Sequence, residues 1–148
     1  MCSARGITAF PPPGLPAPVS RMHQAIVRAT RDCDFDQLER LAVAGRPRFD
    51  FSFTGDKRPA SLWRQREGRG EKFAARLIRL LRMTPKREGQ TYVWPAAFAR
   101  NADDRDWEAL VPTFGQNQVK IFRDYGGYTD LRLGITSDGD WIFCVDGD

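Results

Sequence analysis

Residues 48–54 alternate strictly between polar and apolar side chains, and Phe49, Phe51 and Phe53 fall on one side of the chain. An alternation with a period of two is typical of a half-buried β-strand. Residues 91–94 form a second short apolar run, which stops at a proline. The pattern therefore predicts two strands before the last third of the chain.

The end of the chain predicts a β-hairpin. Two apolar runs flank an Asp-Gly dipeptide at positions 138–139, and this dipeptide is among the strongest signals for a two-residue hairpin turn. In the register that the turn sets, Gly134 faces Phe143, and the missing side chain leaves room for the ring. The same register places Arg132 and Trp141 on the face that carries Phe143.

Apolar residues recur with a helical period elsewhere. The stripe is clearest in residues 71–83, where arginines occupy the polar side. Helices are expected at residues 20–31, 34–44, 71–83 and 116–125, with shorter helical pieces around Leu62 and Trp107. Many helices and few strands predict an α+β fold. We expect a small curved antiparallel sheet with a C-terminal hairpin, packed against several helices.

The first 19 residues differ from the rest of the chain. Five of residues 11–18 are prolines, a composition that favours polyproline II structure over a helix. We therefore expect a proline-rich mobile arm at residues 1–19. The remaining residues, 20–148, have the length and apolar content of one domain.

Charge is distributed unevenly along the 148 residues. The net charge is +4, but residues 61–100 hold ten basic and three acidic residues, whereas residues 101–148 hold four basic and ten acidic residues. These two parts can attract each other in the fold, so basic residues around 64–87 are expected to pair partly with the acidic end. The alternative is a surface that neutralises the phosphates of a nucleic acid. Its candidate residues are Arg69, Lys72, Arg76, Arg79 and Arg82.

Cys2, Cys33 and Cys144 lack the close spacing of a metal or redox pair. An odd number of cysteines without a framework spacing predicts a reducing compartment. No segment approaches the roughly 18 apolar residues needed to span a membrane, and the N-terminus lacks the apolar core of a signal peptide. We therefore expect a cytoplasmic protein with no membrane contact.

Few residues offer recognisable chemistry. His23 is the only histidine, so metal sites with two histidines are excluded and a catalytic triad would depend on one residue. Asp138 and Asp140 lie at the hairpin turn, roughly 20 Å from Asp146 and Asp148, and cannot share a cation with them. Glycine motifs for nucleotide phosphates are missing. We expect no catalytic residue, metal or cofactor.

Arg132 is the charged exception on an otherwise bulky hairpin face. A buried guanidinium needs a partner, which could be Asp50 on the first strand or an anionic ligand. If the sheet curves, aromatic side chains could line a cavity beside Arg132, although such a set more often forms the core. The predicted ligand-binding residues are Arg132, Trp141, Phe143, Trp94 and Tyr92.

The C-terminal segment resembles a family of uncharacterised small bacterial proteins. The shared residues are Gly127-Tyr128, Arg132, Gly134-Ile135, Asp138-Gly139, Trp141, Phe143 and Gly147-Asp148, preceded by the segment Tyr92-Val93-Trp94-Pro95. This resemblance implies no particular activity. Residues 34–41 also resemble the entry to the nuclear-transport-factor-2-like (SnoaL-like, cystatin-like) fold, which implies a curved sheet whose cavity often holds a small ligand.

These observations favour a non-catalytic binding or accessory module that holds a small anionic ligand between sheet and helices. The alternative is a nucleic-acid-binding protein that uses the basic residues 64–87. An enzyme with an unrecognised acid–base site comes third. The oligomeric state is open, and a homodimer is compatible with the sequence.

Overall fold

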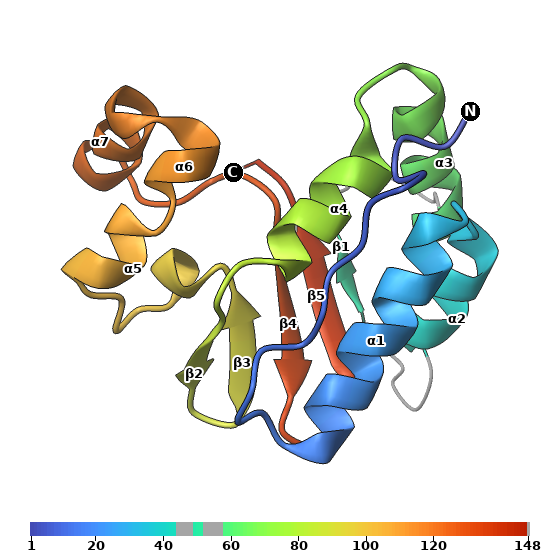
Figure 1. Ribbon diagram of the computed structural model, residues 1–148, viewed down its shortest axis with the longest axis horizontal. Helices are drawn as coiled ribbons and strands as arrows, with labels where there is room; N and C mark the ends of the chain where they lie inside the picture. The colour runs from blue at the N-terminus through green and yellow to red at the C-terminus, as the bar shows by residue number, and fades with distance from the viewer. Residues whose placement is uncertain (44–48, 52–57, 148) are drawn as a thin grey trace.

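The computed structural model describes residues 1–43, 49–51 and 58–147. Four helices cover one face of a β-sheet (Figure 1). They are α1 (Ala17–Arg31), α2 (Phe35–Val43), α3 (Pro59–Gly68) and α4 (Phe73–Leu81). The α+β fold predicted from the sequence is confirmed.

The sheet has the strand order β1-β5-β4-β3-β2. Its strands are β1 (Asp50–Phe51), β2 (Lys86–Glu88), β3 (Thr91–Trp94), β4 (Arg132–Thr136) and β5 (Trp141–Val145). Strands β2 to β5 pair antiparallel, whereas β1 pairs parallel with β5, so the sheet is mixed. Of the strand expected at residues 48–54, Phe53 and its neighbours lie outside the described residues.

The C-terminal hairpin forms with part of the predicted register. Gly134 faces Phe143 as expected, and an added Cβ at Gly134 would lie 2.2 Å from the phenylalanine ring. The register then shifts, so that Ile135 faces Trp141 instead of Ile142. A bulge of one residue moves the following side chains to the opposite face of the sheet. Trp141 therefore lies on the face opposite Phe143.

The main core lies between the sheet and helices α1–α4. Trp63 of α3 stacks on Trp141 of β5 at 5.6 Å and on Phe73 of α4 at the same distance between ring centroids. All three side chains are almost fully buried. Because α4 buries Leu77 and Leu81 along one side, it packs firmly on the sheet and exposes its arginine side.

A second, smaller apolar cluster lies beyond the end of β3. A short 3₁₀ helix, η1 (Ala96–Phe98), leads into α5 (Asp104–Glu108), α6 (Val111–Phe114) and α7 (Gln116–Asp124) (Figure 1). Leu110, Phe122 and Tyr128 are buried there. Helices α5–α7 lie to one side of α4 (Figure 1), whereas Phe98 of η1 contacts Phe143 of β5.

The N-terminal segment is packed, which differs from the mobile arm expected for residues 1–19. It runs beside α1 and α4 (Figure 1), and Ala4 and Ala9 are buried against the main core. Helix α1 begins at Ala17, earlier than Ser20, because a proline is tolerated in the first helical turn. Among the described residues, no helix has both the length and the apolar character needed to cross a membrane.

Candidate functional site

A cleft of about 600 Å³ lies between helix α4 and the α5–α6 segment. The buried Leu110 and the partly buried Met83 give it an apolar wall, and Arg79 and Arg82 give it a basic one. Thr113 of α6 adds a hydroxyl group. A smaller hollow of about 100 Å³ shares Arg79, Met83 and Thr113 with the cleft and extends along α4.

The helical period places three arginines on the side of α4 that faces away from the core. Arg76, Arg79 and Arg82 follow one another at intervals of three residues, whereas Leu77 and Leu81 are buried. Residues three apart in a helix are surface neighbours. Arg79 and Arg82 therefore reach the cleft from adjacent turns.

Arg76 is neutralised by the acidic end of the chain. Its guanidinium lies 2.5 Å from Asp130 and 2.9 Å from Asp146, and Arg66 of α3 also binds Asp146 at 3.1 Å. Burial alone would lower the pKa of Arg76, but the charges of Asp146 and Asp130 outweigh burial and raise the pKa. This pairing confirms the expectation that basic residues of the middle segment meet the acidic end.

Arg79 and Arg82 differ from Arg76. Among the residues that the structure describes, the side chain of Arg79 makes no hydrogen bond or ion pair, and the side chain of Arg82 donates only from Nε, to the Thr8 carbonyl at 2.6 Å. An arginine carries five donors in a planar fork that matches carboxylates and phosphates. Most of these donors are therefore available at the cleft.

The acidic residue of the cleft does not cancel this charge. Asp106 accepts a hydrogen bond from Lys86 at 2.5 Å and another from the Asp103 backbone. The hydrogen bond to Asp106 raises the pKa of Lys86. Because Asp106 is already paired, the cleft keeps the positive charge of its two arginines.

The five predicted ligand-binding residues do not form one site. Trp94 and Tyr92 pair with Leu133 and Ile135 on the helix-covered face, where Trp94 and Trp141 are buried in the main core. Phe143 lies on the other face of the sheet. The one-residue bulge places Trp141 and Phe143 on opposite faces of the sheet. The prediction that both side chains lie on the same face of the hairpin was therefore wrong.

Arg132 has local partners that differ from the two predicted ones. Its guanidinium donates to the carbonyls of Asp130 and Gly147 at 3.1 and 2.8 Å and lies 5.1 Å from the Phe98 ring centroid. Asp50, the predicted partner, is exposed. Since backbone carbonyls and an aromatic face already satisfy Arg132, it is a poorer ligand anchor than Arg79.

His23 is buried in the main core rather than at the cleft. Its Nε2 donates to the Leu81 carbonyl at 2.8 Å, which requires the Nε2–H tautomer. Its Nδ1 and the Trp94 Nε1 lack partners among the described residues. Burial lowers the pKa of His23, although the hydrogen bond to Leu81 acts in the opposite direction. In its neutral form, His23 therefore holds the C-terminal end of α4 in place through this hydrogen bond.

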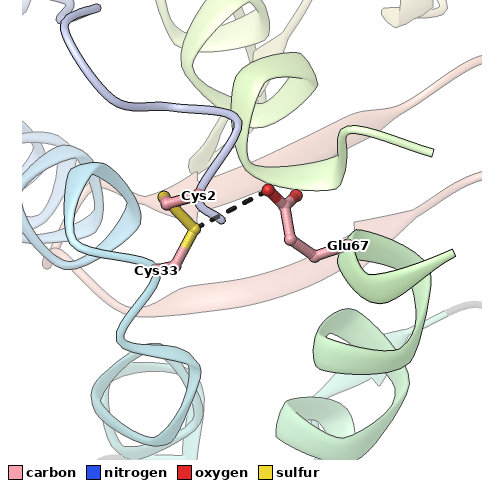
Figure 2. A group of neighbouring side chains, drawn as sticks. All are labelled: Cys2, Cys33 and Glu67. Atoms are coloured by element: carbon pink, nitrogen blue, oxygen red, sulfur yellow. Dashed lines mark hydrogen bonds between the residues drawn. A yellow bond between two sulfur atoms is a disulfide. The ribbon is translucent and has the colours of Figure 1, made fainter. Parts of the chain in front are cut away.

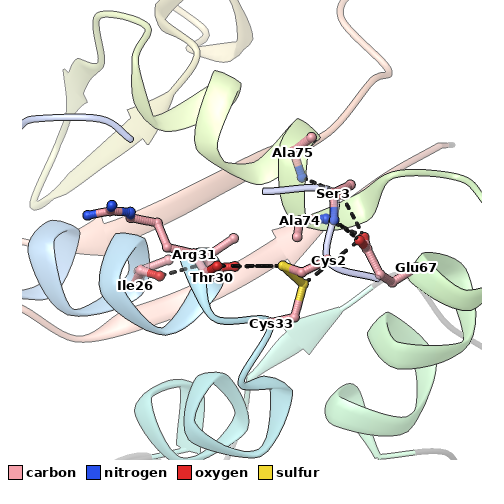
Figure 3. Close-up of a disulfide and its surroundings, with 9 residues drawn as sticks. All are labelled: Cys2, Ser3, Ile26, Thr30, Arg31, Cys33, Glu67, Ala74 and Ala75. Carbon is pink, nitrogen blue, oxygen red and sulfur yellow. Dashed lines mark hydrogen bonds between the residues drawn. A yellow bond between two sulfur atoms is a disulfide. The ribbon is translucent and has the colours of Figure 1, made fainter. Parts of the chain in front are cut away.

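A disulfide between Cys2 and Cys33 joins the N-terminal segment to the residues after α1 (Figure 3). Glu67, at the end of α3, lies beside it. Glu67 accepts hydrogen bonds from the backbone and hydroxyl of Ser3 and from the backbone of Ala74. Burial would raise the pKa of Glu67, but these hydrogen bonds, together with the charge of the N-terminus, outweigh burial and lower the pKa.

The disulfide changes the interpretation of the cysteines. Cys2 and Cys33 are not free thiols, whereas Cys144 is free and buried. Disulfides are typical of oxidising compartments, so the cysteines no longer support the prediction of a reducing compartment. A cytoplasmic location stays a prediction without that support.

Two of the five residues predicted to form the nucleic-acid surface are in ion pairs. Arg69 lies 3.0 Å from Glu71, and Arg76 is bound by two aspartates. Lys72 is exposed at the start of α4. The remaining two candidates, Arg79 and Arg82, line the cleft.

Comparison with protein-family models, with curated proteins and with solved structures finds no match for this chain. The resemblances to a small bacterial protein family and to the nuclear-transport-factor-2-like fold therefore stay predictions. The function has to be inferred from the side chains of the site.

The sequence marked Arg79 and Arg82 as candidate functional residues, but it did not predict the cleft that they line. Arg79 and Arg82 belonged to the predicted nucleic-acid set, and their three-residue spacing was visible in the sequence. Leu110 and Thr113 carried no comparable signal, because their role depends on where α5 and α6 lie relative to α4. The disulfide was missed because Cys2 belongs to a segment that was expected to be mobile.

Proposed function

We propose that this protein is a non-catalytic binding module that holds a small anionic ligand in the cleft between α4 and α5–α6. The observation that carries this proposal is the pair Arg79 and Arg82. Both line the cleft, and among the described residues neither has a carboxylate partner. A pair of adjacent guanidinium groups favours a carboxylate or a phosphate.

The walls of the cleft support a ligand with an apolar part as well. Met83, Pro95 and Leu110 contribute apolar surface close to the two arginines. Ligand sites commonly combine an apolar lining with a few polar groups that fix the orientation. An organic carboxylate or a phosphate ester therefore fits better than a bare inorganic anion.

The nucleic-acid alternative has less support. Arg64, Arg66, Arg69 and Arg76 lie within salt-bridge distance of acidic side chains. A phosphate backbone would have to compete with these intramolecular pairs. The two open arginines line a concave site of limited volume instead of an extended surface.

The proposal can be tested with a panel of small anions. Thermal unfolding is measured with inorganic phosphate, aliphatic and aromatic carboxylates, and phosphate monoesters, and the best compound is titrated by calorimetry. A ligand at 100 times its Kd should add about 2.7 kcal/mol to the free energy of unfolding. R79A and R82A should each weaken binding, whereas R64A, which alters an exposed arginine paired with Asp36, should not.

Two results would contradict the proposal. One is the failure of every anion to stabilise the wild type at millimolar concentration. The other is equal affinity of the wild type and the R79A/R82A double variant for the same compound. A gel shift with single-stranded and duplex nucleic acid at low and high salt provides the comparison with the alternative.

A further inference from the structure

Three potential metal ligands from separate segments meet at the disulfide (Figure 2). Cys2 comes from the N-terminal segment, Cys33 follows α1, and Glu67 belongs to α3. Their ligand atoms, two sulfurs and one carboxylate oxygen, all lie within 4.8 Å of one another. The three residues are partly buried, so the group is accessible to a small ion.

Oxygen atoms that can accept a hydrogen bond or bind a cation lie close to both sulfurs. Cys33 Sγ lies 3.8 Å from Glu67 Oε2, and Cys2 Sγ lies 3.8 and 3.6 Å from the carbonyl oxygens of Thr30 and Arg31 (Figure 3). A sulfur in a disulfide carries no proton, so these contacts are not hydrogen bonds in the oxidised protein. After reduction of the disulfide, a thiol proton or a cation bound by the sulfurs would interact favourably with these oxygens.

The carboxylate is held in place by donors other than the cysteines. Ser3 Oγ and Ala74 N each donate to Glu67 Oε1 at 2.9 Å. Within the part of the chain that the structure describes, the side chains and backbone groups that donate to Glu67 are uncharged. The positive charge of the N-terminus also attracts the Glu67 carboxylate, and Glu67 Oε2 lies 3.8 Å from Cys33 Sγ.

We propose that Cys2, Cys33 and Glu67 form a redox-dependent zinc site. In the oxidised protein the two cysteines are joined as a disulfide. After reduction their thiolates and the Glu67 carboxylate bind one Zn²⁺, and a water molecule completes the tetrahedron. The N-terminal segment is thus tethered by a covalent bond in one state and by a metal ion in the other.

Atoms and electrons are conserved when the disulfide is replaced by the zinc site. Reduction by a phosphine adds two electrons and two protons to the disulfide, while the phosphine becomes its oxide with the oxygen of a water molecule. Binding of Zn²⁺ then displaces the two thiol protons into solvent. The bound ion, two thiolates and one carboxylate together carry one negative charge.

The geometry fits zinc better than a hard cation. Zinc binds thiolates and carboxylates at about 2.3 and 2.1 Å, so a tetrahedral site separates its sulfur and oxygen ligands by about 3.6 Å. The present distance from Cys33 Sγ to Glu67 Oε2 is 3.8 Å. Two sulfurs bound to zinc lie about 3.8 Å apart, a separation that rotation of the cysteine side chains can supply once the disulfide is reduced. Calcium and magnesium prefer oxygen ligands and do not suit two thiolates.

The proposal is tested with the full chain, reduced by a phosphine under anaerobic conditions and titrated with Co²⁺. We expect one Co²⁺ per chain, with thiolate-to-metal charge-transfer absorption and the intense visible bands of tetrahedral cobalt. One equivalent of Zn²⁺ should abolish these bands. The oxidised protein should show none of them, and circular dichroism verifies that both forms are folded.

Variants identify the ligands. C2S and C33S should abolish the charge-transfer absorption. E67Q should lower the Zn²⁺ affinity by at least the roughly tenfold that loss of an outer-shell partner of a metal ligand costs, because Glu67 is a direct ligand. C144S is the matched control, because burial raises the pKa of the Cys144 thiol to about 12 and its side chain lies in the core. If E67Q alters the fold, E67D tests the same carboxylate with a shorter side chain and should also weaken binding.

Three outcomes would overturn the proposal. They are failure of the reduced wild type to bind Co²⁺ in a one-to-one ratio, retention of the absorption in C2S, and binding of Zn²⁺ by E67Q and E67D as tight as that of the wild type. The first two would exclude the zinc site. The third would remove Glu67 from it, and with it the proposed set of ligands.

Discussion

Arg76 and Arg79 lie one turn apart on the same side of helix α4, yet their environments differ. Arg76 is bound by Asp130 and Asp146, whereas Arg79 has no such partner among the described residues and lines the cleft. The acidic end of the chain thus neutralises one end of the helix and leaves the other end positive. On this helix, the paired Arg76 supports the fold, and Arg79 lines the candidate binding site.

The same contrast holds for the two sides of α4. Its inner side is fixed by the main core, by the bond from His23 to Leu81, and by the N-terminal segment, where Ser3 Oγ accepts a hydrogen bond from the Ala75 backbone. Its outer side meets α5–α6 across a cleft. A rigid helix beside a cleft is a suitable support for a binding site.

The largest loss of stability is expected from removing the disulfide. The C2S/C33S double variant should lose about 3–4 kcal/mol of unfolding free energy, because a crosslink between residues 31 apart restricts the unfolded chain. Urea unfolding in the presence of a chelator and without reductant measures this loss. The C144S variant serves as a control for cysteine chemistry. A loss below about 1 kcal/mol would show that the N-terminal segment adds little to stability.

Removing the partners of Arg76 should have the next largest effect. The D130N/D146N double variant should lose about 1–3 kcal/mol, less than a fully buried pair would, because these side chains are 20–31% exposed. The matched control is D138N, which alters an exposed aspartate at the hairpin turn. Equal stability of the two variants in urea would contradict a structural role for the Arg76 pairs.

His23 should make stability depend on pH. Because burial lowers its pKa below 6.5 in the folded protein, the unfolded chain binds the proton more readily. Stability should therefore be full above pH 6.5 and fall at lower pH, by about 1.4 kcal/mol for each unit until the folded pKa is reached.

The H23Q variant isolates this contribution. Glutamine can still donate to the Leu81 carbonyl but cannot titrate, so its stability should fall less between pH 7.5 and 5.5. Urea unfolding at four pH values provides the comparison. Parallel curves for wild type and H23Q would exclude His23 as the source of the pH dependence.

The smallest change in stability is expected on the open side of α4. R79A and R82A should each alter the unfolding free energy by less than about 0.5 kcal/mol, since exposed side chains with few contacts contribute little. The same thermal and urea measurements provide the test. A loss of 2 kcal/mol or more in R79A would mean that Arg79 has a structural partner and is not available for a ligand.

Local sequence signals predicted much of the fold. The Asp-Gly turn and the helical period of residues 71–83 predicted the hairpin and α4, and Gly134 opposite Phe143 followed from that turn. The bulge could not be predicted, because both neighbouring residues, Trp141 and Ile142, are apolar and suit either face. It moved Trp141 into the core and divided the predicted ligand site.

The candidate site could be predicted only in part, because it depends on contacts between distant segments. The charge segregation predicted that some arginines would pair with the acidic end, but not which ones. Asp146 reaches Arg66 and Arg76 because β5 ends beside α4. Likewise, Cys2 meets Cys33 only because the N-terminal segment packs beside α1.

The most direct test of the binding proposal observes the three arginines of α4 together. Arginine Nε–Hε signals are assigned by NMR with single lysine substitutions and followed during titration with the best anion of the panel. The signals of Arg79 and Arg82 should shift and saturate together, while that of Arg76 should change little. Equal shifts of all three signals, or no saturable shift of Arg79 and Arg82, would contradict the account.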